Sequence, residues 1–94
     1  MSDSIISNEK RCFVCGTTLN LHRHHIFHGR NKDNSEREGC WVYLCFHHHD
    51  DYSKDCVHNN PAFETTLKKF CQYIWEEKNG SRDDFREIFD KSYL

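Results

Sequence analysis

The 94-residue sequence predicts one small α+β domain that needs disulfide bonds or a bound metal ion for stability. A chain of this length buries only about 60% of the surface that its unfolded form exposes, so its hydrophobic core is thin. Hydrophobic residues make up 36% of the chain, yet it contains six Cys and eight His. Two strand-like segments precede two helix-like segments. We therefore expect an α+β fold held together by disulfides or by a metal ion.

The N-terminal residues favour an intracellular protein. The start, MSDSIISNEKR, has neither the positive charge nor the apolar run of a signal peptide. No segment approaches the 18 consecutive apolar residues of a membrane span. We therefore expect a cytoplasmic protein with no membrane contact, and in a reducing compartment its thiols favour metal ligation over disulfides.

The first half of the chain predicts a β-hairpin. Residues 1–10 are polar and aperiodic and are expected to form a disordered tail, so the folded domain spans residues 11–94. Residues 19–27 suit a short strand, and residues 40–45 combine β-branched and aromatic side chains typical of a second one. Residues 28–39 contain two Gly and no large apolar side chain, which predicts a solvated loop.

The second half of the chain predicts helices. Residues 46–52 suit a short helix at the end of a core that spans residues 11–60, and residues 61–94 add two further helices. Asn60 followed by Pro61 is typical of a helix start, and Ser81 is a cap for the last helix. The side chains expected to face the core are Phe63, Leu67, Phe70, Cys71, Ile74, Trp75, Phe85, Ile88 and Phe89.

Two pairs of ligand-type side chains predict a structural zinc site. Cys12 and Cys15 form a CxxC motif followed by Gly, and Cys45 and His48 repeat the same spacing. Four such ligands form a closed tetrahedral zinc site. His47 is an alternative to His48. A redox role for the CxxC motif is weaker, because Gly-Thr-Thr follows it instead of a helix.

Three further histidines have no role in that site: His24, His25 and His49. Neighbouring side chains of a strand point to opposite faces, so His24 and His25 cannot simply bind one ion side by side. One imidazole can then hold a cation while the other activates water. The alternative is a pair of exposed strand histidines. His22, His28 and His47 are expected to face solvent, Cys56 to be a loop thiol and Cys71 a core thiol.

The order of CxxC, HHI, LCxxHH and a later His resembles the HNH endonuclease family, which has the ββα-metal fold, across residues 12–58. The resemblance implies a metal-dependent hydrolase of DNA phosphodiester bonds. It implies that His25 is the general base and that the catalytic cation, such as Mg²⁺, Mn²⁺ or Ni²⁺, binds His24, His49 and His58. Zinc would be held by Cys12, Cys15, Cys45 and His48.

A narrower resemblance extends to the end of the chain. The segments RHHIFHG, SEREG, VYLC and DDFREIFDKSYL are similar to those of small HNH proteins encoded by phages and prophages of Gram-positive bacteria. This likeness implies a zinc-stapled ββα-metal domain with additional C-terminal helices. Cys40 stands where the family has its middle Asn, and Asn34 is a candidate replacement. Ser53 stands at the usual late ligand position.

The charge distribution permits DNA as a partner. The net charge is -2, so the chain has no bulk basic character. Between residues 9 and 37, six basic residues nevertheless outnumber three acidic ones. Among the basic residues, Arg23, Arg30 and Lys32 flank the histidines in the sequence and are candidates for phosphate contacts. The alternative function is a non-catalytic zinc module that binds DNA or binds and inhibits a host protein; a phage protein partner and the oligomeric state stay open.

Overall fold

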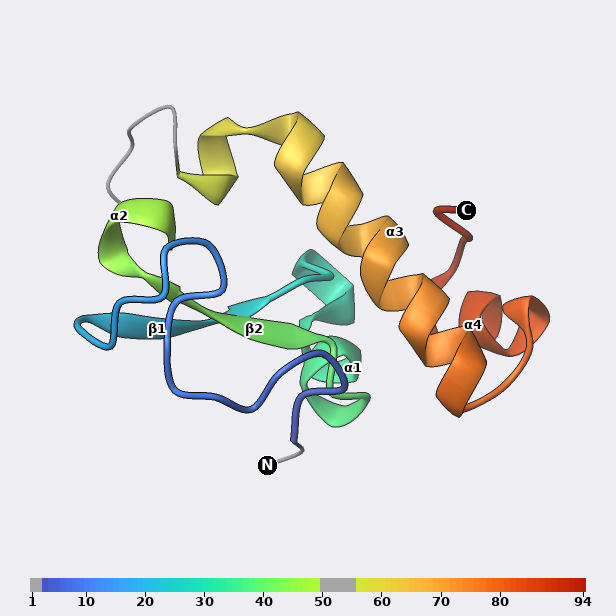
Figure 1. Cartoon of the computed structure of the whole chain (residues 1–94). Coiled ribbons are helices and arrows are strands. Elements are labelled where there is room, and N and C mark those ends of the chain that lie inside the picture. Colours follow the sequence, from blue (N-terminus) through green and yellow to red (C-terminus); the bar gives the residue numbers. More distant parts are fainter. Residues whose placement is uncertain (1–2, 50–55) are drawn as a thin grey trace.

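The two predicted strands pair as an antiparallel hairpin with helices after it (Figure 1). The computed structural model describes residues 3–49 and 56–94, except the side chain of His58. Strand β1 is Leu21–His25 and strand β2 is Trp41–Cys45. The helices are α1 (Lys32–Arg37), α2 (Phe46–His49), α3 (Pro61–Lys78) and α4 (Arg82–Phe89), with 3-10 turns at Gly29–Asn31 and Val57–Asn59. The predicted α+β class is confirmed.

The hairpin register fixes which side chains meet at its two ends. Leu21 lies opposite Cys45 at one end, and His25 lies opposite Trp41 at the other. Strand β2 is buried at four of its five positions, as expected for a strand with its apolar residues in the core. Helix α2 follows β2 directly, so the orientation of β2 also sets that of α2.

The segment predicted as a solvated loop, residues 28–39, instead contains helix α1. Its sequence KDNSER shows no apolar period, but Ser35 is fully buried. Ser35 Oγ accepts a hydrogen bond from the Phe27 N–H at 3.2 Å and donates one to the Cys40 carbonyl at 2.5 Å. One hydroxyl therefore satisfies backbone groups next to both strands, and this long-range contact holds a helix that local periodicity does not indicate.

The predicted starts of the two C-terminal helices are confirmed. Asn60 Oδ1 accepts from the Phe63 N–H at 3.1 Å, and Pro61 occupies the first helical position of α3. Ser81 and Asp84 form a reciprocal capping box at the start of α4. Among the described residues, no helix is both long and apolar enough to cross a membrane.

The core side of α3 differs from the expected stripe most at Phe70, and Phe63 and Ile74 are only half-buried. Leu67, Cys71 and Trp75 are buried, but Phe70 is 43% exposed. Buried Gln72 accepts a hydrogen bond from the Tyr93 N–H at 2.7 Å. The side of α3 that faces the core is therefore centred on Leu67, Cys71 and Trp75, and Phe70 lies at its edge.

A cluster of aromatic rings joins the hairpin to α4. The ring of Phe27, just after β1, lies 4.4 Å from Phe89 and 5.5 Å from Phe85 between centroids. Trp75 of α3 also contacts Phe85, at 5.5 Å. Figure 1 shows α3 and α4 together at the end of the hairpin where α1 lies. The C-terminal helices are thus part of the same core as the strands.

Part of the expected tail, residues 1–10, packs against the hairpin. Ser4 Oγ donates to the Trp41 carbonyl at 2.6 Å, and the Ile5 N–H donates to the Gly39 carbonyl at 2.9 Å. Gly39 has φ 73°, and a Cβ there would lie 2.4 Å from the Asp3 carbonyl oxygen. The prediction of a disordered tail is therefore wrong for this part of the chain. The sequence does not reveal these contacts, because backbone hydrogen bonds leave no apolar pattern.

Substitution of Phe85 tests the aromatic cluster. Phe85→Ala removes a fully buried ring and should lower the free energy of unfolding by about 3–5 kcal/mol. Phe70→Ala makes the same chemical change at the exposed edge of α3 and should cost less than about 1 kcal/mol. Guanidinium unfolding of both variants in their metal-loaded form measures the difference. Equal destabilisation would mean that α4 does not share the core of the hairpin.

Candidate functional site

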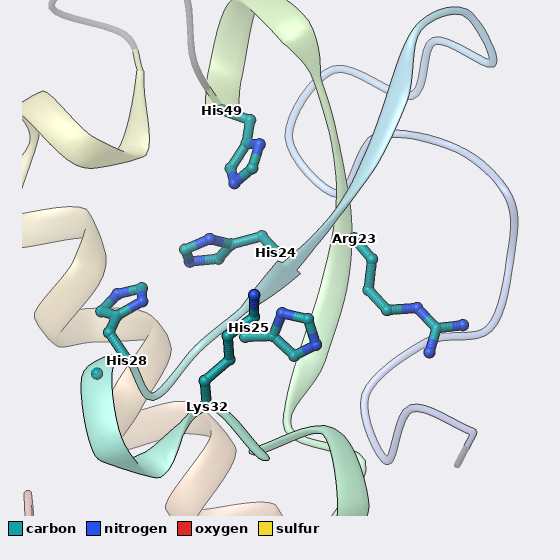
Figure 2. A pocket seen from close by; sticks show the side chains of 7 residues that line it. Arg23, His24, His25, His28, Lys32 and His49 are labelled. Atoms are coloured by element: carbon teal, nitrogen blue, oxygen red, sulfur yellow. The ribbon is translucent and has the colours of Figure 1, made fainter. Parts of the chain in front are cut away.

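A pocket of about 300 Å³ opens where β1 ends (Figure 2). Its walls come from β1, the following 3-10 turn, the start of α1 and the end of α2. Among the described residues, its lining contains no acidic side chain. The lining residues are Arg23, His24, His25, His28, Gly29, Lys32 and His49. Such a pocket suits an anionic ligand.

His24 and His25 point to opposite sides of β1, as the strand period predicts. The side chain of His24 points toward His28 and His49 in Figure 2, whereas that of His25 turns toward the side of Arg23. His24 is 1% exposed, and His25 is half-buried. The two imidazoles therefore occupy different environments within one pocket.

Four histidines gather on the His24 side. The ring centroids of His28 and His49 each lie 5.3 Å from that of His24, and His22 Nδ1 lies 3.0 Å from His49 Nδ1. His22 and His28 were expected to face solvent; His28 is exposed as expected although its ring borders the cluster, whereas His22 is half-buried in it. The period of two puts His22 on the same face as His24, a signal in the sequence that could have identified it.

His25 has a carboxylate partner that the sequence did not indicate. Its Nε2 lies 3.2 Å from Glu36 Oε1, and Arg23 Nη1 donates to both Glu36 oxygens at 2.9 and 2.8 Å. The Arg23 guanidinium in turn stacks over the Trp41 ring at 3.8 Å. Glu36 lies on α1, so its position depends on a helix that was predicted as loop.

Glu36 remains ionised at neutral pH. Partial burial raises the pKa of its carboxyl group, but hydrogen bonds and charges from Arg23 and His25 outweigh burial and lower it below the usual value. The carboxylate therefore accepts hydrogen bonds from both partners. An ionised orienting group beside an imidazole favours a fixed tautomer of that imidazole.

Neither candidate for the middle Asn contacts His25. Cys40 is fully buried, and its pKa is raised by a hydrogen bond with Cys71 and by burial, which makes it a neutral core thiol. Asn34 Nδ2 donates to the Ile88 carbonyl at 3.1 Å and thereby joins α1 to α4. The hypothesis that Asn34 replaces the orienting Asn is wrong, since Asn34 faces α4.

The three basic residues expected at the site differ in position. Lys32 lines the pocket, and Arg23 lines it while paired with Glu36. Arg30 is outside the lining, with a side chain 81% exposed and 3.2 Å from Asp90 Oδ1. Of the three, Arg23 and Lys32 therefore line the pocket and Arg30 does not.

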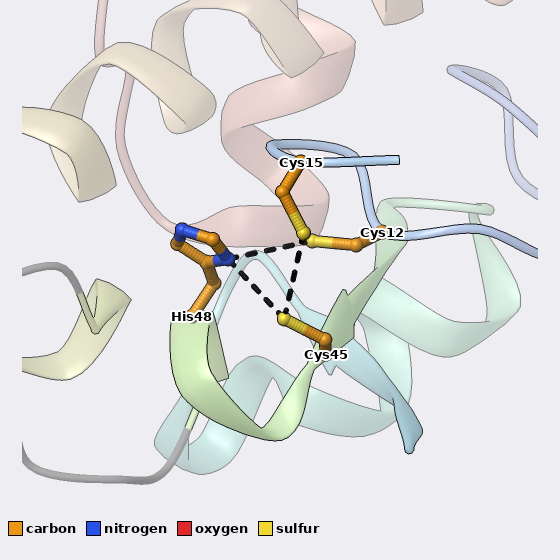
Figure 3. Close-up of side chains that lie close together, drawn as sticks. All are labelled: Cys12, Cys15, Cys45 and His48. Atoms are coloured by element: carbon orange, nitrogen blue, oxygen red, sulfur yellow. Dashed lines mark hydrogen bonds between the residues drawn. The ribbon is translucent and has the colours of Figure 1, made fainter. Parts of the chain in front are cut away.

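A second group of ligand-type side chains forms a compact cluster away from the pocket lining (Figure 3). His48 Nδ1 lies 3.2 Å from Cys45 Sγ and 3.7 Å from Cys12 Sγ, and the Sγ atoms of Cys15 and Cys45 are 3.8 Å apart. All four ligand atoms lie within 4.8 Å of one another. In a tetrahedral zinc site the ligand atoms are about 3.5–3.8 Å apart, so this cluster can hold such an ion.

Local backbone geometry explains why these side chains converge. Gly16 has φ 77° and donates its N–H to the Cys12 carbonyl at 2.9 Å, which closes the turn that carries both N-terminal thiols. Cys45 ends β2, and His48 follows one turn later on α2. His47 is exposed and lies outside the cluster. Of the two histidines, the structure thus brings His48 to the three thiols.

The cluster is chemically suited to a soft or borderline metal. All six cysteines lie in described segments, and none forms a disulfide. Burial raises the pKa of Cys12, but backbone hydrogen bonds with Cys15, Cys45 and Val14 outweigh it and lower the pKa to about 6. Burial raises the pKa of Cys45. A lowered pKa favours the thiolate of Cys12, and a metal ion bound here would displace a proton from Cys45.

Two further predictions concern the segment after α2. Cys71 is a core thiol as expected. Cys56 lies in a loop as expected, just before the 3-10 turn Val57–Asn59, but it is buried and donates its S–H to the His49 carbonyl at 2.7 Å. Cys56 thus helps to hold the end of α2. Ser53 and the side chain of His58, the expected third cation ligand, lie outside the described residues.

Comparison of the chain with protein-family models, with curated proteins and with solved structures finds no match in any of the three. The pocket and the Cys/His cluster are therefore interpreted from their own chemistry.

Adjacent histidines offer a matched test of the Cys/His cluster. The wild type should retain one tightly bound metal ion per chain, and His48→Ala should lose most of it and unfold at a lower temperature, because ligand binding contributes folding free energy. His47→Ala should retain the ion and the stability of the wild type. Elemental analysis and thermal unfolding measure both effects. Equal metal content in the two variants would exclude His48 as a ligand.

Proposed function

We propose that the protein is a metal-dependent endonuclease of the HNH type that hydrolyses DNA phosphodiester bonds. One observation carries the proposal: His24 and His25 present their imidazoles to opposite sides of β1, and His25 is held by Glu36 beside a pocket whose described lining has no acidic side chain. General-base catalysis needs a positioned imidazole. A phosphodiester substrate needs an electropositive pocket.

The order of the structural elements supports the HNH interpretation. A β-hairpin leads directly into α2, which carries His48 in the Cys/His cluster and His49 in the pocket. We assign structural zinc to the cluster, because three thiols and one imidazole suit zinc. The zinc would then hold the N-terminal turn, β2 and α2 together and leave the next residue, His49, for the catalytic pocket.

In the proposed reaction, His25 takes a proton from the water that attacks phosphorus. Glu36 accepts the hydrogen bond of the Nε2 proton, so Nδ1 is the unprotonated nitrogen of the neutral imidazole. Arg23 donates hydrogen bonds to both carboxylate oxygens of Glu36, and its guanidinium stacks on the Trp41 ring. The positioned carboxylate also stabilises the imidazolium that forms when the proton is taken.

We assign the catalytic cation to His24 and His49, with His58 as the third ligand expected from the sequence. The imidazole donors fit a transition metal such as Ni²⁺ better than Mg²⁺, which prefers oxygen ligands. When bound, the cation supplies charge stabilisation for the phosphoryl and leaving oxygens. Lys32 contacts a phosphate of the DNA, and exposed Arg30 extends the basic surface beyond the pocket.

A non-catalytic metal module that binds a protein partner is the second candidate. Exposed apolar side chains around the Cys/His cluster favour it: Phe13, Val14 and Phe46 are 41–50% exposed, and Leu19 is 69% exposed. Grouped apolar surface of this kind is typical of protein contacts. DNA cleavage by the wild type, together with loss of cleavage in the His25→Ala variant, would favour the endonuclease over the non-catalytic module.

Replacement of His25 tests the general base. His25→Ala should lower the cleavage of plasmid DNA by a factor of about 100 to 10,000, since a positioned base contributes that much. His47→Ala, purified in parallel, should cleave like the wild type. Nicking measured with Ni²⁺, Mn²⁺ and Mg²⁺ on zinc-loaded protein provides the rate. Equal nicking by wild type and His25→Ala would show a contaminating nuclease or a different base.

Lys32 offers a test of phosphate binding. In the cleavage-deficient His25→Ala background, Lys32→Gln should weaken DNA binding and lower the slope of log affinity against log salt by about 1. Lys78→Gln removes an equal charge at the exposed end of α3 and should leave both quantities unchanged. Fluorescence anisotropy at several salt concentrations measures them. An unchanged slope for Lys32→Gln would exclude a phosphate contact at the pocket.

A further inference from the structure

We propose that His28, oriented by Glu64 of helix α3, is a ligand of the divalent cation held by His24 and His49. The inference rests on the cation site of the proposed function and adds to it a residue that the sequence placed in solvent. It also gives helix α3 a direct role at the site. The cation would bind between β1, the segment that follows it, and α2.

The spacing of the rings supports this assignment. His28 and His49 enter the pocket from different elements, and their side chains point toward His24 in Figure 2. Each ring centroid lies 5.3 Å from that of His24. Two imidazoles bound at a tetrahedral angle, with metal–nitrogen bonds of about 2.0–2.1 Å, have centroids about 5 Å apart. The His24 ring is thus spaced from each of the other two rings as two imidazoles on one ion would be.

Each outer histidine has a partner on its other ring nitrogen. His28 Nε2 contacts Glu64 Oε1, and His49 Nδ1 lies 3.0 Å from His22 Nδ1. Histidines that bind metals almost always donate their second N–H to a carboxylate, a carbonyl or water, which fixes the tautomer. Glu64 therefore keeps the proton on Nε2 of His28, so that Nδ1 carries the ligand lone pair.

The contact between His28 and Glu64 is unlike a simple solvated ion pair. Glu64 is only 23% exposed although it lies in the first turn of α3, and His28 is 38% exposed. The pair bridges the pocket and a helix that begins more than thirty residues later in the chain. It therefore connects α3 to the pocket, and we infer that cation binding and the docking of α3 support each other.

Cation titration tests the inference without any activity measurement. Zinc-loaded protein is titrated with Ni²⁺ by calorimetry, and zinc content and circular dichroism are checked for every variant. His28→Ala and Glu64→Gln should each weaken Ni²⁺ binding by a factor of about 10 to 100. His47→Ala and Glu77→Gln replace exposed residues outside the pocket and should bind Ni²⁺ like the wild type.

The outcomes separate this inference from the proposed function. If His24→Ala and His49→Ala lose Ni²⁺ but His28→Ala and Glu64→Gln bind it normally, His28 is no ligand and the inference is overturned while the cation site stands. If the folded wild type binds no second ion, both are overturned. If Ni²⁺ binds as expected and wild-type protein cleaves no DNA, the ligand set stands and the nuclease function fails.

Discussion

Cys45 and His48 lie one helical turn apart where β2 passes into α2, so a metal ion bound there fixes the direction in which α2 leaves the sheet. The same ion would tie the N-terminal turn of Cys12 and Cys15 to this junction. Because His49 directly follows His48, its imidazole reaches the histidine-lined pocket at the end of β1 only when α2 has this direction. In a chain with a thin core, a metal ion held there would therefore contribute both to stability and to the placement of His49.

The pocket depends on a second set of contacts at the opposite end of the hairpin. Ser35 anchors α1 through backbone groups of Phe27 and Cys40 next to the two strands, and α1 carries Glu36 to His25. Arg23 neutralises Glu36 and rests on the Trp41 ring, so the orienting carboxylate is itself held in place. Ser35 thus helps to place the carboxylate that contacts the His25 imidazole, while the backbone of His25 is held by its pairing with Trp41 in the hairpin.

The sequence predicts the parts of this structure that depend on local chemistry. The capping signals at Asn60 and Ser81 and the equal spacing of the two ligand pairs each have a nearby cause, and the structure confirms the caps and the convergence of the pairs. Helix α1 could not be predicted in this way, because it has no apolar period and is stabilised by the long-range contacts of Ser35. Glu36 was missed for the same reason, since its partner is found only once α1 is placed.

The acidic residues near the pocket explain how a chain of net charge -2 can present an electropositive site. Glu36 pairs with Arg23 and His25, Glu64 contacts His28, and Glu38 accepts a hydrogen bond from Trp75 Nε1 at 3.0 Å. Each of these carboxylates therefore has a hydrogen-bond partner, and none of them is among the described lining residues. Since Coulomb interactions weaken with distance and screening, the local field in the pocket depends on nearby charges such as Lys32, and on the pairing of Arg23 with Glu36, more than on the net charge of the chain. Net charge is thus a poor guide to the partner of this protein, and the placement of its few basic side chains is a better one.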